Sequence, residues 1–191
     1  MITTKKQLKK IIVEEKAFYV PQKMKWEWIL TSDNSVKIFK YLKNLRKAEF
    51  YYNTRKNPFN KIMYFFVRRK KNKLGRLLGI EMWENTFDSG LKIWHAGNIV
   101  INGKAKVGKN CTLHGNNCIG NTGKSSACPR LGNNVRLGFG ATVIGDVELA
   151  DGVIVAAGAV VVDSCLQENA VLAGVPARCV KISEVGQGKK E

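Results

Sequence analysis

Two histidines, His95 and His114, are the residues best suited to acid–base chemistry in this chain of 191 residues, and the sequence contains no other histidine. An unperturbed imidazole has a pKa near ~6.5, so it can accept a proton at neutral pH and act as a general base. Five cysteines, at positions 111, 118, 128, 165 and 179, form an odd set without Cys-x-x-Cys spacing. This pattern argues against a disulfide framework and against a zinc site. We therefore expect reduced, buried thiols and no metal.

The charge of the chain is unevenly distributed. Residues 1–79 contain 21 Lys and Arg against 5 Asp and Glu, whereas residues 80–191 contain 11 against 10. Hydrophobic residues make up 45% of the chain, enough for one core, and no apolar run approaches the ~20 residues that span a bilayer. The N-terminus lacks a long apolar segment followed by a small-residue cleavage site, so a cytoplasmic protein is expected.

The basic half predicts short helices. Ile38, Tyr41, Leu42 and Leu45 recur at helical spacing, soon after a plausible cap in residues 32–35. An apolar stretch at 62–67 precedes a cationic cluster at 68–73, which could contact an anionic membrane surface, hold an acidic glycan or simply be a solvated face. Nucleic acid is disfavoured, because the segment has neither a known binding signature nor an aromatic stacking platform.

The second half carries an internal repeat of six residues. Aliphatic side chains stand in one register at 101, 107, 113 and 119, and again at 131, 137, 143, 149, 155 and 161. Smaller residues follow four positions later: Ala105, Cys111, Asn117, Val135, Ala141, Val147, Val153 and Ala159. Phe87 and Ile93 are also six apart but two places out of register, so an irregularity lies between Ile93 and Ile101.

Such a period predicts a solenoid, in which three flat segments close a triangular coil of about 18 residues. Gly and Asn between the columns tolerate positive φ and permit a corner after each short strand. We predict that Leu131 stacks on Leu149 and Leu137 on Val155. The stretch 120–130 breaks the repeat without changing its register, so it is expected to loop out of the coil. An antiparallel sandwich would instead show period-two alternation.

Over about residues 80–182 the sequence resembles the hexapeptide-repeat acyltransferases, and within them the serine acetyltransferase group. The resemblance rests on the run Leu-Lys-Ile-Trp-His-Ala-Gly at 91–97, on Gly-x-Thr-Gly-Lys-Ser at 120–125, on Pro-Arg-Leu at 129–131 and on Ala-Gly-Val-Pro-Ala-Arg at 173–178. It implies a mainly β fold, a left-handed parallel β-helix preceded by an α-helical domain. The domains expected are 1–79 (basic, α-helical), 80–182 (β-helix) and 183–191 (polar tail).

The resemblance further implies a homotrimer, in some relatives paired into a hexamer, with acetyl-CoA as co-substrate between neighbouring coils and catalysis at the subunit boundary. His95 matches the family's general base. His114 is the reserve candidate and could equally be an ordinary surface residue. For the acid that supports the base, ungapped counting reaches Ile80, so Glu81 is favoured over Asp88, with both being solvated as the alternative.

Residues expected to bind acetyl-CoA also follow from the resemblance. Phe139 and Gly140 in one coil and Ala157 and Gly158 in the next would border the pantetheine arm. Gly120, Thr122 and Lys124 belong to the matching run at 120–125. Arg178 and Lys181, with Lys124, could meet the phosphates of CoA, although each could equally be a solvated cation.

Three departures bear on the acceptor. Where serine acetyltransferases carry Asp before the base and an Arg-His pair before the restart of the repeat, this chain carries Trp94, Ala127 and Cys128. The changes remove polar groups that serine needs, and Trp94 offers a flat face for a sugar ring, so we expect a glycan hydroxyl of capsular or exopolysaccharide type as acceptor. Trp94 could instead lie at a trimer interface. The alternatives are serine O-acetylation and a non-catalytic β-helix that scaffolds or binds an anionic polymer.

Overall fold

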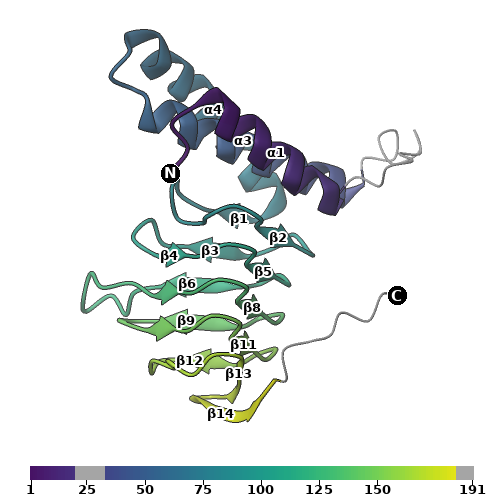
Figure 1. The fold of residues 1–191 in the computed structure, drawn as a ribbon, viewed down its shortest axis with the longest axis vertical. Coiled ribbons are helices and arrows are strands. Elements are labelled where there is room, and N and C mark those ends of the chain that lie inside the picture. The colour runs from purple at the N-terminus through teal and green to yellow at the C-terminus, as the bar shows by residue number, and fades with distance from the viewer. Residues whose placement is uncertain (20–32, 184–191) are drawn as a thin grey trace.

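The computed structural model describes residues 1–19 and 33–183. Three helices lie across one end of a stack of short strands, and the C-terminal hairpin lies at the other end (Figure 1). The helices are α1 (Lys5–Tyr19), α3 (Asn34–Asn53) and α4 (Pro58–Leu78). Among the described residues, the structure contains no helix that is both long enough and apolar enough to cross a membrane.

Both long helices start and stop at residues suited to the task. The carboxylate of Asp33 caps α3 by accepting the N–H of Ser35 at 2.7 Å. Asp33 lies within the cap predicted at residues 32–35, of which Ser32 is outside the described residues. Helix α4 ends at Gly79, whose φ of 65° is left-handed. The prediction of short helices is wrong in length, because α3 and α4 have 20 and 21 residues. Lys and Arg are good helix formers, so the charged stretches extend the helices.

The strands form three sheets that are the faces of a parallel β-helix. Sheet A contains β1 (Ile80–Glu81), β3 (Ile99–Ile101), β6 (Cys118–Gly120), β9 (Thr142–Ile144) and β12 (Val160–Val161). Sheet B contains β4 (Lys106–Val107), β7 (Arg130–Leu131) and β10 (Glu148–Leu149). Sheet C contains β2 (Lys92–Ile93), β5 (Thr112–Leu113), β8 (Arg136–Leu137), β11 (Ile154–Val155), β13 (Ala170–Gly174) and β14 (Ala177–Ile182), of which the last pair is antiparallel.

The pairing confirms the six-residue repeat. Leu149 pairs with Leu131, and Val155 with Leu137, as the period predicts. Between Ile119 in sheet A and Leu131 in sheet B the chain makes a loop, after which the register resumes. Because this loop is accommodated at a corner, the aliphatic column inside the coil is not disturbed.

Gly and Asn at the corners serve two purposes. Asn134 and Gly140 have φ of 58° and 70°, as the corner prediction requires. Gly138, directly after an aliphatic residue, is needed for close approach instead, since a Cβ there would lie 2.6 Å from the backbone nitrogen of Ala157 in the next coil. A Cβ on Gly132 would likewise lie 2.8 Å from the backbone nitrogen of Asp151, so glycine at these two positions permits the coils to stack.

A single hydrophobic core runs from the helices through the coils. It includes Leu42 and Leu45 of α3, which are completely buried, and continues through the aliphatic columns to Leu172. The helical layer is thus packed onto the first coil and shares its core.

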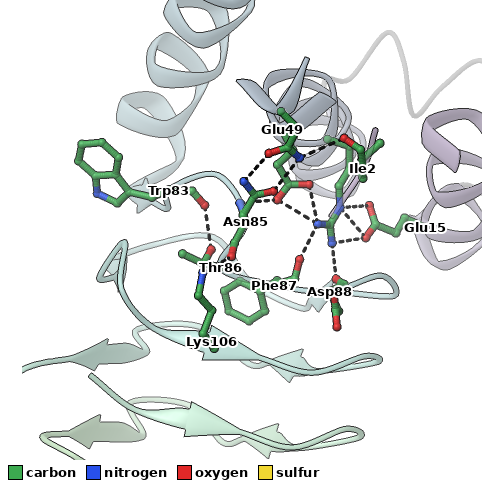
Figure 2. Close-up of polar contacts among 11 residues, drawn as sticks. Ile2, Glu15, Glu49, Trp83, Asn85, Thr86, Phe87, Asp88 and Lys106 are labelled. Carbon is green, nitrogen blue, oxygen red and sulfur yellow. Dashed lines mark hydrogen bonds and ion pairs between the residues drawn. The ribbon is translucent and has the colours of Figure 1, made fainter. Parts of the chain in front are cut away.

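A buried ionic cluster joins the helices to the first coil (Figure 2). Arg46 of α3 donates to the carboxylate of Glu15 in α1 at 2.7 Å and to that of Glu49 at 3.0 Å, and all three side chains are at most 2% exposed. The same guanidinium donates to the backbone carbonyl oxygens of Phe87 at 2.9 Å and Asp88 at 2.7 Å. One cation therefore connects two helices and the chain that leads into the coil.

Two carboxyl groups share this one guanidinium, so the cluster would carry an excess negative charge if both were ionised. Burial raises the pKa of the Glu49 carboxyl, and pairing with Arg46 opposes the shift only in part. Because the folded state holds that proton more tightly than the unfolded chain, the contribution of Glu49 to stability is expected to fall as the pH rises through and above the ordinary carboxyl pKa.

Replacing Glu49 by Gln is expected to remove this part of the pH dependence. Denaturant unfolding of both proteins from pH 5 to pH 8 measures it: the wild type should lose stability relative to Glu49→Gln as the pH rises. Glu14→Gln, at an exposed position whose carboxylate contacts Lys10 at 3.9 Å, is the matched control and should follow the wild type. Parallel curves for the wild type and Glu49→Gln would contradict the expected proton uptake.

Candidate active site

His95 lies at the corner where the chain passes from β2 to β3, on the edge between sheets C and A. We call this edge the His95 edge; it comprises residues 94–98, 114–116, 138–140 and 156–158 of successive coils. The step from Ile93 to Ile101 takes eight residues instead of six, and the side chain of His95 is exposed there. A Cβ added to Gly115 would lie 3.2 Å from the Cβ of His95 and 3.3 Å from the Cδ2 of Phe139. The three residues are therefore stacked on adjacent coils.

His114 belongs to the same edge. Its ring centroid lies 6.0 Å from that of Trp94, and the Nζ of Lys92 lies 3.9 Å from the Trp94 ring centroid. Burial lowers the pKa of His114, and the nearby charges of His95, Arg136 and Lys92 lower it further. The imidazole of His114 is therefore held in its neutral form at neutral pH, and Trp94 keeps half of its surface exposed.

The two candidate acids lie in different places. Glu81 is exposed in β1 and pairs with Val100, so it sits on the sheet that begins at the His95 edge. Asp88 is also exposed, but its backbone N–H donates to the carbonyl oxygen of Val107, at the end of sheet B. Of the two, only Glu81 lies in a sheet that borders the His95 edge, and its role in supporting the base remains a prediction.

The four residues predicted to border pantetheine lie together. The backbone N–H of Gly158 donates to the carbonyl oxygen of Phe139 at 2.8 Å, and that of Gly140 donates to the carbonyl oxygen of Gly115 at 2.9 Å. Phe139 is 51% exposed, Ala157 is exposed, and a Cβ added to Gly158 would meet no atom within 4 Å. The His95 edge thus continues downward as an open strip of small residues beside one exposed ring.

The run at 120–125 lies at another corner. The carbonyl oxygen of Gly120 accepts the N–H of Gly145 at 3.0 Å, and a Cβ on Gly145 would lie 3.4 Å from the Cγ2 of Thr122. Lys124 is exposed in the loop between β6 and β7, which joins sheets A and B. Within one chain this corner and the His95 edge are therefore at opposite ends of the strands of sheet A. Cys128, at the end of the loop, is only 8% exposed and offers little surface to a substrate from within one chain.

The C-terminal cations are divided between the ends of a hairpin. Arg178 pairs with Ala173, and its guanidinium contacts the carboxylate of Asp163 at 2.7 Å, with both side chains about two-thirds exposed. Lys181 pairs with Val171 at the other end of the hairpin. Arg178 therefore already has an acidic partner that a phosphate would have to displace.

Asn117, the residue that follows 114–116 of the His95 edge, was not assigned to the site by sequence reasoning. It is completely buried, accepts the N–H of Gly115 at 2.9 Å and donates to the carbonyl oxygens of Gly138 at 2.7 Å and Ala141 at 3.2 Å. Its amide therefore fixes the backbone of two coils next to His95. The signal was present, because Asn117 is the polar member of a column otherwise made of Ala, Cys and Val.

Comparison with known proteins supports this architecture. The family model described as bacterial transferase hexapeptide (six repeats) matches residues 129–163. A serine acetyltransferase of Helicobacter pylori (strain J99) is 31% identical over 128 residues, covering 65% of this chain and 74% of that protein. The chain belongs to the serine acetyltransferase-like hexapeptide-repeat acyltransferases. Its fold is accordingly the left-handed parallel β-helix of this family.

Two further relatives bear different names. The putative colanic acid biosynthesis acetyltransferase WcaB of Escherichia coli K12 is 40% identical over 87 residues, covering 45% of this chain and 53% of that protein. A serine acetyltransferase of Synechococcus elongatus is 33% identical over 123 residues, covering 62% of this chain and 50% of that protein. The chain therefore spans about half the length of these two relatives.

Solved structures of the family share the fold over nearly the whole chain. The Neisseria gonorrhoeae serine acetyltransferase superposes with a TM-score of 0.73 at 22% identity, covering 96% of this chain and 70% of that one. A serine acetyltransferase has also been solved as a complex with CoA, with a TM-score of 0.71 at 19% identity, covering 92% of this chain and 71% of that one. The agreement includes the helical layer as well as the β-helix.

The His95 edge suits the chemistry of an acyltransferase. An exposed imidazole can reach the hydroxyl of an acceptor, and a neutral histidine lies beside it on the next coil. The strip formed by Phe139, Gly140, Ala157 and Gly158 leaves room for a narrow, flexible chain against the backbone. The residues present are therefore compatible with acetyl-CoA.

Proposed function

We propose that the protein transfers an acetyl group from acetyl-CoA to a hydroxyl of a cell-surface glycan or of its precursor. The observation that carries the proposal is the position of His95, exposed at the head of an edge that continues into the strip around Ala157 and Gly158. Acetyl-CoA supplies a thioester. The oxygen of the acceptor hydroxyl forms a bond to its carbonyl carbon, and the bond from that carbon to sulfur breaks.

His95 is proposed to take the proton of the acceptor hydroxyl, which is poorly ionised at neutral pH, while the oxygen attacks directly. The C–S bond breaks, and the proton passes from the imidazolium to the leaving thiolate, which gives free thiol. Because the acceptor oxygen attacks the thioester directly, the enzyme forms no covalent intermediate. Glu81 is proposed to stabilise the protonated imidazole of His95. The neutral imidazole of His114 is proposed to contact the acceptor.

The preference for a glycan rests on Trp94. Its ring is half exposed and lies near both Lys92 and His114, so a sugar ring would meet an aromatic surface close to hydrogen-bonding groups. The similarity to WcaB agrees with this choice. Serine O-acetylation is the second candidate, because the Helicobacter and Synechococcus relatives bear that name.

The site is also proposed to lie between subunits of a homotrimer. The loop with Thr122, Lys124 and Cys128 and the His95 edge lie at opposite ends of sheet A, so one chain cannot bring them together. A neighbouring chain could place its loop against this edge. Light scattering of the purified protein would measure a mass of three chains, or of six where trimers pair.

Release of free thiol from acetyl-CoA tests the function directly. We would assay the protein against serine, neutral sugars, nucleotide sugars and acidic oligosaccharides. Release that depends on a sugar supports the glycan proposal, and release that depends on serine supports the second candidate instead. No release with any acceptor, together with no binding of CoA, would contradict both and favour a scaffold.

Replacing Ala157 by Trp is expected to raise the KM for acetyl-CoA at least about tenfold, because the indole would fill the open strip where a narrow chain must lie. Stability should change little, since Ala157 is exposed. Initial rates at varied acetyl-CoA measure the effect. The control, Leu166→Trp, places the same side chain at an exposed position outside the edge. An unchanged KM in Ala157→Trp would move the binding site elsewhere.

A further inference from the structure

The outer face of the helical layer carries a groove lined by cations from two helices. Its volume is about 830 Å³, and it runs between α3 and α4 on the side turned away from their buried residues. We call it the lysine groove; its charged lining is Lys40, Lys43 and Lys47 of α3 and Lys70, Lys73 and Arg76 of α4.

No carboxylate of the described residues balances the positive charge of the lysine groove. The groove lining contains no Asp or Glu, and within residues 1–19 and 33–183 none of its six cations forms an ion pair. Elsewhere the chain does supply carboxylates to cations: Lys71, inside the cluster at 68–73, is buried and contacts Glu84 at 2.9 Å. Burial lowers the pKa of Lys47, and the charges of Lys43 and Lys70 lower it further. The groove therefore favours an anionic partner.

An apolar stripe lies beside these cations on α4. Phe59, Ile62, Phe66 and Leu77 are between 57% and 70% exposed. With Lys70 and Lys73 they follow helical spacing along one face, in steps of three or four residues. A face that exposes large apolar side chains next to unpaired cations is typical of a helix that lies in a membrane interface.

We propose that the lysine groove and the apolar stripe of α4 together dock the protein on an anionic lipid bilayer. Anionic headgroups would occupy the groove, and the apolar side chains would enter the interface between headgroups and acyl chains. A hydrophilic polyanion would satisfy the cations but leave the stripe in water. A second copy of this face would bring six like charges against six, which opposes self-association.

Docking of this kind fits the arrangement of the molecule. The helices form one end of the stack, and the first coil, which leads into the His95 edge, lies directly beneath them (Figure 1). The coils would project away from the bilayer, with the His95 edge beginning at the coil closest to it. Lipid binding is independent of acetyl transfer, so failure of one proposal does not imply failure of the other.

Sedimentation of the full chain with vesicles tests the proposal. Vesicles of phosphatidylcholine with 30% phosphatidylglycerol should bind the protein, and vesicles of phosphatidylcholine alone should bind it at least tenfold less. Lys40→Gln/Lys43→Gln is expected to weaken binding about 25-fold, at roughly fivefold for each lysine near an anionic surface. Phe66→Ser should weaken it about tenfold by removing buried apolar area.

Matched variants on the β-helix test whether the effect of a substitution depends on its position or only on the kind of change. Lys104→Gln/Lys109→Gln makes the same charge change, and Leu166→Ser a comparable apolar-to-polar change, at exposed positions far from the groove; both should bind like the wild type. Equal losses in the two lysine pairs would overturn the proposal in favour of general charge attraction. Tight binding to heparin, together with unchanged vesicle binding in Phe66→Ser, would favour a polyanion as the partner. Self-association of the wild type that is lost in Phe66→Ser would favour a second copy of the chain. Either result would overturn lipid docking.

Discussion

Replacing His95 by Ala is expected to lower kcat for acetyl transfer by about 10²- to 10⁴-fold, the usual contribution of a positioned general base. The acceptor hydroxyl would then have to lose its proton to water. The strip formed by Phe139, Ala157 and Gly158 would be unchanged, so the affinity for CoA should be retained. A loss confined to kcat would therefore identify a group that acts on the reacting atoms.

The measurement is the initial rate of thiol release, with CoA affinity measured separately by calorimetry. His114→Ala is the matched control, since it removes an imidazole from the adjacent coil of the same edge. We expect a smaller loss in His114→Ala, expressed mainly in the KM for the acceptor. Full activity in His95→Ala together with a large loss in His114→Ala would transfer the role of base to His114.

The β-helix could be predicted from sequence because its core residues recur every six positions. Each coil repeats the same three faces, so the spacing of Leu131, Leu137 and Leu149 fixes both which residues point inward and which lie on top of one another. Interruption at 120–130 was visible for the same reason. Handedness was not contained in the period and came from resemblance to the family.

The candidate site was predictable only residue by residue. His95, Phe139 and Gly158 belong to different coils, and their alignment on one edge depends on how many residues each coil contains. The eight-residue step after Ile93 could be read from the sequence, but which corner each side chain occupies could not. This is also why the sequence favoured Glu81 over Asp88 only by counting residues, whereas the structure places Glu81 in sheet A and Asp88 beside sheet B.

The ionic cluster beneath the helices could not be predicted. Arg46 and Glu49 are three residues apart and would ordinarily form an exposed pair on a helix, whereas Glu15 lies 31 residues from Arg46. Only the packing of α1 against α3 brings Glu15 to the guanidinium and buries all three side chains. The sequence periodicity of α3 places Arg46 next to buried Leu45 but does not say what it contacts.

Replacing Arg46 by Met is expected to lower the free energy of unfolding by about 3–5 kcal/mol, because the substitution leaves Glu15 and Glu49 buried without a cation. The carbonyl oxygens of Phe87 and Asp88 would also lose their donor. Denaturant unfolding at neutral pH measures the loss. Arg178→Met is the matched control: its pair with Asp163 is about two-thirds exposed, so that substitution should cost no more than about 1 kcal/mol.

A triple variant separates the contribution of Arg46 to the free energy of unfolding from the cost of leaving two buried carboxylates without a cation. Arg46→Met/Glu15→Gln/Glu49→Leu removes all three charges, and replacing a buried ionic group by side chains of similar volume is often neutral or stabilising. We therefore expect it to be more stable than Arg46→Met alone. If the triple variant is instead the less stable of the two, then the carboxylates in Arg46→Met must have been satisfied by water or by protons. The carboxylate of Glu49, which accepts the N–H of Asn85 at 3.1 Å, would then stabilise the helical layer even without its cation.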